Sequence, residues 1–197
     1  MKRLILILML AVMLPMPGEA QFSVGLRDTR YIYGQYTLHQ HFFGRIEQSI
    51  YSESIGYQYM RGYLGYKTHV RNWGLMANGY FGSIFNRNYH SEGAMLSAKY
   101  SFLKRLFLKG TINPHHDSGY GYKTCFNAYG GVGIIKTLDF IAGYSTIPEY
   151  RMSEKRVRVG FDFHSGNLNV SPLVSFATTG ASKANRLRVM VSFNYNF

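Results

Sequence analysis

The last segment of the chain, residues 184–197, alternates between apolar and polar side chains at almost every position. One face of this segment is apolar and consists of Leu187, Val189, Val191, Phe193, Tyr195 and Phe197. Because successive side chains of a β-strand point to opposite sides, this alternation predicts a strand with one apolar and one polar face. Such a strand suits a membrane barrel with lipid on one side, and it also suits a half-buried strand of a soluble β-sandwich.

The same alternation recurs along the chain and divides it into segments of roughly ten residues, the length of a barrel strand. Twelve strands are predicted, at 21–28, 30–39, 42–51, 55–69, 72–85, 91–103, 105–113, 121–136, 137–146, 153–165, 167–178 and 184–197. Ten strands are the alternative, because 21–28 and 30–39 could form one bent strand and another of the predicted hairpins could be misread. Pro172 lacks a backbone donor, so we expect a bulge or bend in the strand over 167–178.

The connections between these segments differ in length. Short turns are expected near 39–42, 69–72, 103–105, 136–138 and 165–167, and longer polar loops near 85–91, 113–121, 146–153 and 178–185. In outer-membrane barrels the short turns are periplasmic and the longer loops are extracellular. An even number of strands then places both chain ends on the periplasmic side.

Beyond its first residues the chain has no run of ten consecutive apolar residues, so it can span a membrane only as a closed barrel. The 17 Tyr and 14 Phe are strand formers that also suit membrane interfaces. Cys125 is the only cysteine, which excludes an internal disulfide. We therefore predict an all-β fold, an antiparallel up-and-down transmembrane barrel, as a single domain over residues 21–197.

The start of the chain has the pattern of an export signal. Lys2 and Arg3 precede an unbroken apolar run over residues 4–14, and Gly18 and Ala20 supply small residues for a cleavage site. That run is about half the length that spans a bilayer as a helix. We expect residues 1–20 to be cleaved and the mature chain to be exported.

The chain closes on an aromatic residue, Phe197, at the end of its alternating last strand. This resembles the C-terminal signature of Gram-negative outer-membrane β-barrels. The resemblance implies that Phe197 is an insertion signal read by the barrel assembly machinery. It also implies an outer-membrane location, in contact with membrane lipids and lipopolysaccharide.

The net charge is +12, and without the signal the chain keeps 20 basic and nine acidic residues. If the apolar faces meet lipid, the opposite faces line the lumen. The basic residues expected there, as contacts for anions, are Arg27, Arg45, Lys99, Arg105, Lys109, Arg156, Arg158 and Arg188, and Lys123 has the same parity. Arg61 and Lys67 are less well placed, because the parity of 55–69 is ambiguous. The acids of the same faces are Glu47, Asp139 and Asp162. The surplus cations must be hydrated or must meet anions, because a buried unpaired charge is very unfavourable.

A narrow, basic and hydrated lumen would select anions. In size and charge the chain is similar to the small twelve-stranded anion-preferring porins for acidic sugars. This similarity implies a pore for small anionic solutes. One alternative is a plugged, non-conducting structural or adhesin-like barrel, whose loops at 113–121 and 146–153 bind lipopolysaccharide or a partner.

The other alternative is a lipid-modifying outer-membrane enzyme. The segment from His115 to Ser118 supplies a base, an acid and a hydroxyl, and the segment from His164 to Asn167 pairs a histidine with a serine. Adjacent side chains in one loop rarely converge on a reacting atom. The same loop could instead form a surface metal site from His115, His116 and Asp117. No phosphate loop, Cys–His framework or nucleic-acid module is present. We therefore predict no enzyme, no cofactor, no resident metal and no nucleic-acid partner.

Overall fold

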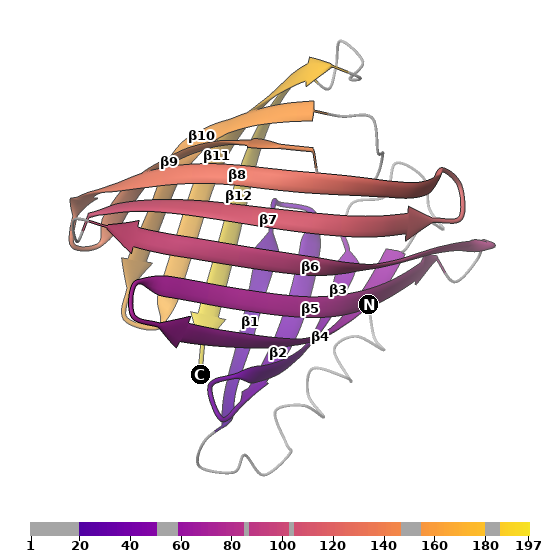
Figure 1. Cartoon of the computed structure of the whole chain (residues 1–197), viewed down its shortest axis with the longest axis horizontal. Helices are drawn as coiled ribbons and strands as arrows, with labels where there is room; N and C mark the ends of the chain where they lie inside the picture. Colours follow the sequence, from indigo (N-terminus) through magenta and orange to yellow (C-terminus); the bar gives the residue numbers. More distant parts are fainter. Residues whose placement is uncertain (1–19, 51–58, 85–86, 103–104, 147–154, 180–185) are drawn as a thin grey trace.

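The computed structural model describes residues 20–50, 59–84, 87–102, 105–146, 155–179 and 186–197. These residues form twelve antiparallel strands that close into one barrel, in which every strand pairs with its neighbours in the chain and β1 pairs with β12 (Figure 1). The strands are β1 Ala20–Arg27, β2 Tyr31–Leu38, β3 Phe42–Ser49, β4 Tyr59–Val70, β5 Trp73–Ile84, β6 Tyr89–Phe102, β7 Leu106–Asp117, β8 Gly121–Ile135, β9 Leu138–Ser145, β10 Lys155–Ser165, β11 Leu168–Thr179 and β12 Leu187–Asn196. The twelve-stranded closed barrel is confirmed, and a two-layer sandwich is excluded.

The first two strands are separate, which is why the barrel has more than ten strands. A turn of three residues, 28–30, joins them, and its central residues Asp28 and Thr29 have positive φ values of 54° and 59°. The Arg30 N–H donates to the Arg27 carbonyl across this turn at 3.0 Å. Two central residues with positive φ form the tight hairpin that matches the twist of neighbouring strands. The hairpin therefore closes within the barrel wall instead of extending from it.

The two ends of the barrel are defined here by their connections. The "turn end" carries the turns at 39–41, 71–72, 136–137 and 166–167, the start of β1 and the end of β12. The opposite end is called the "loop end". The predicted signal segment lies outside the described residues, except that Ala20 already begins β1. Among the described residues, no helix is long and apolar enough to cross a bilayer.

The loop predicted at 113–121 is wrong. Strand β7 continues to Asp117 and β8 begins at Gly121, so only residues 118–120 form a turn. The sequence hid this extension because the outward positions after Ile112 are Pro114 and His116, which are not the apolar strand formers that mark the outer face of a barrel strand. Strand β6 likewise begins at Tyr89, earlier than predicted.

The bulge expected at Pro172 is absent. The pairing of β10 with β11 keeps one register on both sides of this residue, from Gly160↔Leu173 to Phe163↔Val170, and its register shift lies at Lys155/Arg156. The barrel instead accommodates Pro172 with a glycine on the facing strand. A Cβ at Gly160 would lie 2.2 Å from the Pro172 carbonyl oxygen, so only glycine fits there.

The outer face is apolar and the inner face is largely polar. Leu64 and Val189 on the outside are 77% and 72% exposed, whereas Glu47 and Asn113 on the inside are almost completely buried. This reverses the distribution of a water-soluble protein and is the pattern of a membrane-spanning barrel. Functional side chains must therefore be sought on the inner wall and at the two rims.

Candidate functional site: the inner wall of the barrel

Contacts between strands that are not neighbours identify the inner wall. The Tyr59 hydroxyl of β4 lies 2.5 Å from the Ser91 hydroxyl of β6, and the Tyr33 hydroxyl of β2 donates to Asn194 of β12 at 2.8 Å. Each contact passes over an intervening strand. Only side chains on the concave face of a barrel converge in this way, so these residues line the lumen.

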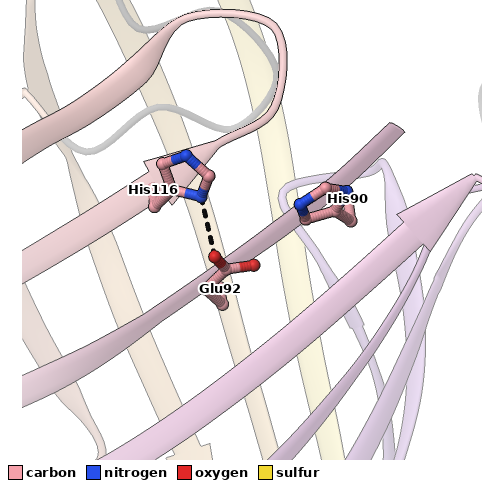
Figure 2. Close-up of side chains that lie close together, drawn as sticks. All are labelled: His90, Glu92 and His116. Atoms are coloured by element: carbon pink, nitrogen blue, oxygen red, sulfur yellow. Dashed lines mark hydrogen bonds and ion pairs between the residues drawn. The ribbon is translucent and has the colours of Figure 1, made fainter. Parts of the chain in front are cut away.

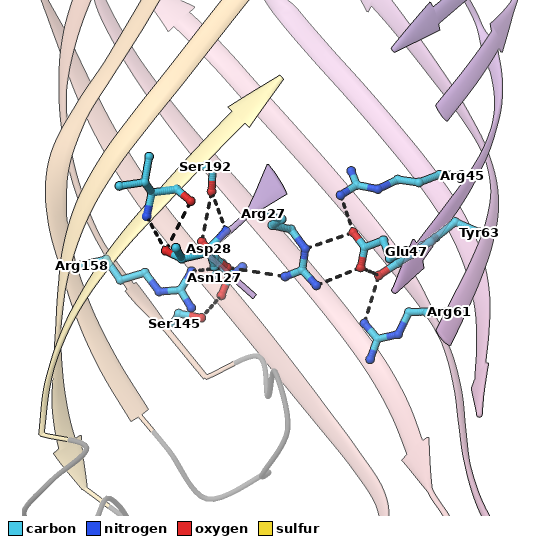
Figure 3. A network of polar contacts seen from close by, with 12 residues as sticks. Arg27, Asp28, Arg45, Glu47, Arg61, Tyr63, Asn127, Ser145, Arg158 and Ser192 are labelled. Atoms are coloured by element: carbon cyan, nitrogen blue, oxygen red, sulfur yellow. Dashed lines mark hydrogen bonds and ion pairs between the residues drawn. The ribbon is translucent and has the colours of Figure 1, made fainter. Parts of the chain in front are cut away.

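A carboxylate, Glu47 on β3, is the centre of the largest charged group on this wall. Arg27 donates to it twice, from Nε to Oε1 at 3.0 Å and from Nη2 to Oε2 at 2.9 Å. Arg45 also forms an ion pair with Glu47, and the Tyr63 hydroxyl donates to Oε2 at 2.9 Å. Figure 3 shows these side chains converging from β1, β3 and β4. The paired, bidentate geometry is the strong form of an arginine–carboxylate contact.

A third arginine, Arg61 on β4, is fully enclosed beside this group. Its Nε donates to the Tyr59 hydroxyl at 2.7 Å and its Nη1 to the Tyr63 hydroxyl at 3.0 Å. Its guanidinium also lies 4.6 Å from the centre of the Tyr80 ring. Arg61 is therefore held in two ways. Phenolic oxygens accept hydrogen bonds from its guanidinium, and a tyrosine ring attracts it by a cation–π interaction.

The group continues across the barrel seam through Asp28, in the turn between β1 and β2. Asp28 Oδ2 lies 3.5 Å from Arg27 Nη1 and 3.8 Å from Arg158 Nη1 on β10 (Figure 3). The backbone N–H of Asp28 donates to Ser192 Oγ on β12 at 2.8 Å. We call Arg27, Arg45, Arg61 and Arg158, with Glu47 and Asp28, the "arginine belt". It joins four cations to two acids.

Two lysines on β6 and β7 form a second cationic group, here called the "lysine pair". Lys99 and Lys109 are directly opposite each other in the β-ladder, and both point inward by the alternation of their strands. Lys99 Nζ lies 4.0 Å from the centre of the Phe107 ring. Neither lysine forms an ion pair with a described residue. Lys109 faces the lumen and yet is exposed, so solvent space reaches it inside the barrel.

The acids on the facing wall are engaged elsewhere. Asp162 on β10 accepts a hydrogen bond from Ser171, and Asp139 on β9 lies 3.9 Å from His164. Among the described residues the lysine pair has no carboxylate within ion-pair distance, and the charge of Asp162 on β10 acts on Lys109 from farther away.

The predicted lumen cations are distributed unevenly. Arg156 is buried and donates to Ser175 through Nε at 2.6 Å and through Nη2 to its carbonyl at 3.0 Å. Arg188 faces inward opposite Ser175 in the ladder of β11 with β12. Arg105 is a correction: it lies exposed in the turn before β7, because that strand begins one residue later than predicted.

Of the less certain candidates, Arg61 is in the belt and Lys67 is near the turn end. Lys67 lines a cavity of about 600 Å³ together with His41, His69 and the start of β1. Lys123 lies near the loop end of β8. The sequence did not predict Asp28 as a lumen acid, because a turn residue has no strand parity. The short hairpin turn that contains Asp28 is a signal that could have placed it at the inner rim.

The four residues of the predicted histidine cluster are divided between the two faces of the barrel wall. His115 is buried on the inner wall, 2.5 Å from the Tyr80 hydroxyl, whereas His116 points to the outer face toward Glu92. Ser118 accepts a hydrogen bond from the His90 backbone. Consecutive residues of a strand point to opposite faces, so His116 is separated from His115 and Asp117, which lie 4.0 Å apart on the inner wall.

Phe197 lies at the turn end of β12. Its backbone N–H donates to the Phe22 carbonyl at 2.8 Å, and its ring packs against Tyr195 and Phe22 at centroid distances of 5.0 and 6.0 Å. The residue is exposed on the outer side of the seam between the first and last strands. Its role as an insertion signal stays a prediction.

Solved structures share the fold of this chain. The KdgM porin, in complex with disordered oligogalacturonate and alone, superposes with TM-scores of 0.61 and 0.60 at 10% identity, covering 90% of this chain and 98% of the porin. The NanC porin gives a TM-score of 0.50 at 9% identity over 90% of this chain and 97% of that one. No protein-family model and no curated protein sequence matches the chain. The likeness is therefore one of architecture.

Proposed function

We propose that this chain is a small outer-membrane pore that passes anionic solutes. The observation that carries the proposal is the lysine pair, two inward cations that face each other with no ion-pair partner among the described residues, while Lys109 stays open to solvent. Like charges directly opposite in a sheet are unfavourable for folding. An anion bound in the lumen would neutralise Lys99 and Lys109, and this would explain why two lysines face each other across β6 and β7.

The arginine belt supports this function in a different way. Its guanidinium groups are fixed by carboxylates and tyrosines, so they hold the wall in one shape. The belt still has four cations for two acids, which leaves a positive potential in the lumen. A narrow pore with low-dielectric walls concentrates such a field and raises the local concentration of anions.

The solute class we propose is a carboxylated sugar or a similar small organic acid. The KdgM porin, which shares this architecture, has been solved in complex with disordered oligogalacturonate, an acidic oligosaccharide. In the present chain, lysine ammonium groups would meet the carboxylates of such a solute.

The test is the reversal potential of single channels in a KCl gradient. The parent barrel should conduct and should prefer chloride to potassium. The double variant Lys99→Gln with Lys109→Gln should keep its conductance and lose roughly two-thirds or more of that preference, since it removes the unpaired charge. The matched control is Lys136→Gln, which removes one positive charge in an exposed turn outside the lumen. A closed bilayer trace of the parent, or an unchanged preference in the double variant, would overturn the proposal.

The outer-membrane location belongs to the same proposal. Removal of residues 1–20, insertion by the barrel assembly machinery through Phe197, and contact of the outer face with lipid and lipopolysaccharide would follow from it. Migration on a gel that changes with heating, together with an N-terminus at residue 21 by mass spectrometry, would test these points. A chain that fractionates with soluble proteins would contradict them.

A further inference from the structure

Three side chains capable of binding a metal ion meet on the outer face of β6 and β7 at the loop end (Figure 2). His90 and Glu92 are two residues apart on β6 and therefore point to the same side. His116 on β7 is directly opposite Glu92 in the β-ladder. Two neighbouring strands thus place two imidazoles and one carboxylate together, although His116 is 24 residues from Glu92 and more from His90 in the chain.

The distances fit a shared ion. One ligand atom of each side chain lies within 4.8 Å of the others, and His116 Nδ1 is 2.7 Å from Glu92 Oε1. In a tetrahedral zinc site, where nitrogen and oxygen ligands lie at about 2.0–2.2 Å from the metal, the ligands are roughly 3.3 Å apart. A small rotation of the His90 side chain would close the remaining gap.

The backbone around these residues is firmly held. The His90 N–H donates to Ser118 Oγ at 3.1 Å, and the Ser118 N–H donates to the His90 carbonyl at 3.0 Å. The two rings also have packing partners, because His116 lies 4.3 Å from the Tyr122 ring and His90 stacks on Phe81 at 6.4 Å. The ligands would therefore lose little conformational freedom when they bind an ion.

The cluster lies where the apolar band of the outer face ends. On β6 the outward positions beyond Glu92 are Ala94 and Leu96, and on β7 those beyond His116 are Pro114 and Ile112. His90 is exposed and the Glu92 side chain is 43% accessible. A hydrated ion can reach this place from the aqueous side, which would be impossible within the band itself.

We propose that His90, Glu92 and His116 form a zinc site on the outer rim of the barrel. Two imidazoles with one carboxylate suit Zn²⁺, whereas Ca²⁺ and Mg²⁺ prefer sites made of oxygen atoms. Three protein ligands leave the fourth position to water or to an outside donor. Because Glu92 and His116 belong to adjacent strands, the ion also links β6 to β7.

The experiment is calorimetric titration of ZnCl₂ into the full-length barrel in detergent after removal of metals with a chelator. The parent should bind one equivalent at this site, and MgCl₂ should not compete. His116→Ala and Glu92→Gln should each weaken binding at least about tenfold. His164→Ala, at a half-buried histidine of the turn end, should leave it unchanged, and heat-modifiable migration shows that each variant is folded.

Two outcomes would overturn the site. One is the absence of zinc binding by the folded parent. The other is binding that survives in both His116→Ala and Glu92→Gln and is lost in the double variant of His41 and His69, the two histidines of the turn-end cavity. Neither outcome bears on conductance, so the test is independent of the proposed pore.

Discussion

The arginine belt and the lysine pair both place positive charge on the inner wall, and they differ in every other respect. The acids of the belt are buried with Arg61 and Arg158, while Arg27 and Arg45 are half-buried. Each of the four cations has an acid, a hydroxyl or a ring beside it. The lysine pair has ring contact for Lys99 and open solvent for Lys109. Arginine presents a planar fork that binds carboxylates in two places, whereas lysine carries a compact, strongly hydrated charge on a flexible stem.

The difference indicates a division of tasks within one lumen. Paired arginines supply rigidity, because a buried carboxylate with several donors fixes the strands that contribute them. In the proposed pore, the lysines, which have no ion-pair partner among the described residues, would supply the field that acts on a passing solute. The predictions below test this division, from the largest expected effect to the smallest.

The acid at the centre of the belt should contribute most to stability. Glu47→Gln keeps the shape of the side chain and leaves Arg27, Arg45 and Arg61 with no central carboxylate. We expect a loss of about 3 kcal/mol in the free energy of unfolding, as for a broken buried ion pair. Urea unfolding of the barrel in lipid vesicles measures it. Glu92→Gln, on the accessible outer rim, is the control and should change little without metal; equal stability of Glu47→Gln and the parent would refute the structural role of the belt.

Reversal of the lysine charges should act on selectivity instead. In the variant Lys99→Glu with Lys109→Glu, the ratio of chloride to potassium permeability should fall by roughly tenfold, equivalent to about 1.4 kcal/mol. The effect should shrink between 0.1 and 1 M KCl, because the Debye length falls from about 10 to about 3 Å. Reversal potentials at both salt concentrations provide the measurement. If the permeability ratio changed neither with the charge reversal nor with the KCl concentration, the residues that determine selectivity would lie elsewhere in the barrel.

The phenolic part of the belt should have an intermediate effect on stability. Tyr63→Phe removes a hydroxyl that donates to Glu47 and accepts from Arg61. We expect a loss of about 1–2 kcal/mol in the free energy of unfolding, because buried charged partners each lose a hydrogen bond. Tyr122→Phe, whose side chain is 86% exposed, is the matched control in the same urea experiment. If Tyr63→Phe and Tyr122→Phe had the same free energy of unfolding, the Tyr63 hydroxyl would not contribute to the stability of the belt.

The smallest effect has the opposite sign. Lys109→Met removes one of two like charges that face each other across β6 and β7, so the barrel should become more stable by about 0.5 kcal/mol. Lys136→Met in the exposed turn should be neutral. The urea midpoint distinguishes the two. A destabilised Lys109→Met would mean that the lysine has a structural partner, which contradicts its proposed availability to solutes.

Much of the fold was predictable from local pattern. The strand of residues 184–197 and the closed count of twelve follow from alternation, because a barrel in lipid needs one apolar face on every strand. The inward direction of Arg27, Arg158 and Lys99 follows from the same parity. The extension of β7 to Asp117 was not predictable, since its polar inward residues are satisfied by partners on other strands.

The sequence by itself determined the class of barrel, which face each strand turns to the lumen and the surplus of positive charge there. Only the tertiary structure decided which cations are neutralised. Pairing depends on contacts such as Arg27 to Glu47 and Asp28 to Arg158, which join strands that are not neighbours. Strand parity carries no information about such contacts, because closure and register set which inward side chains meet. The outer-rim group of His90, Glu92 and His116 arises for the same reason, from the register that sets β6 against β7.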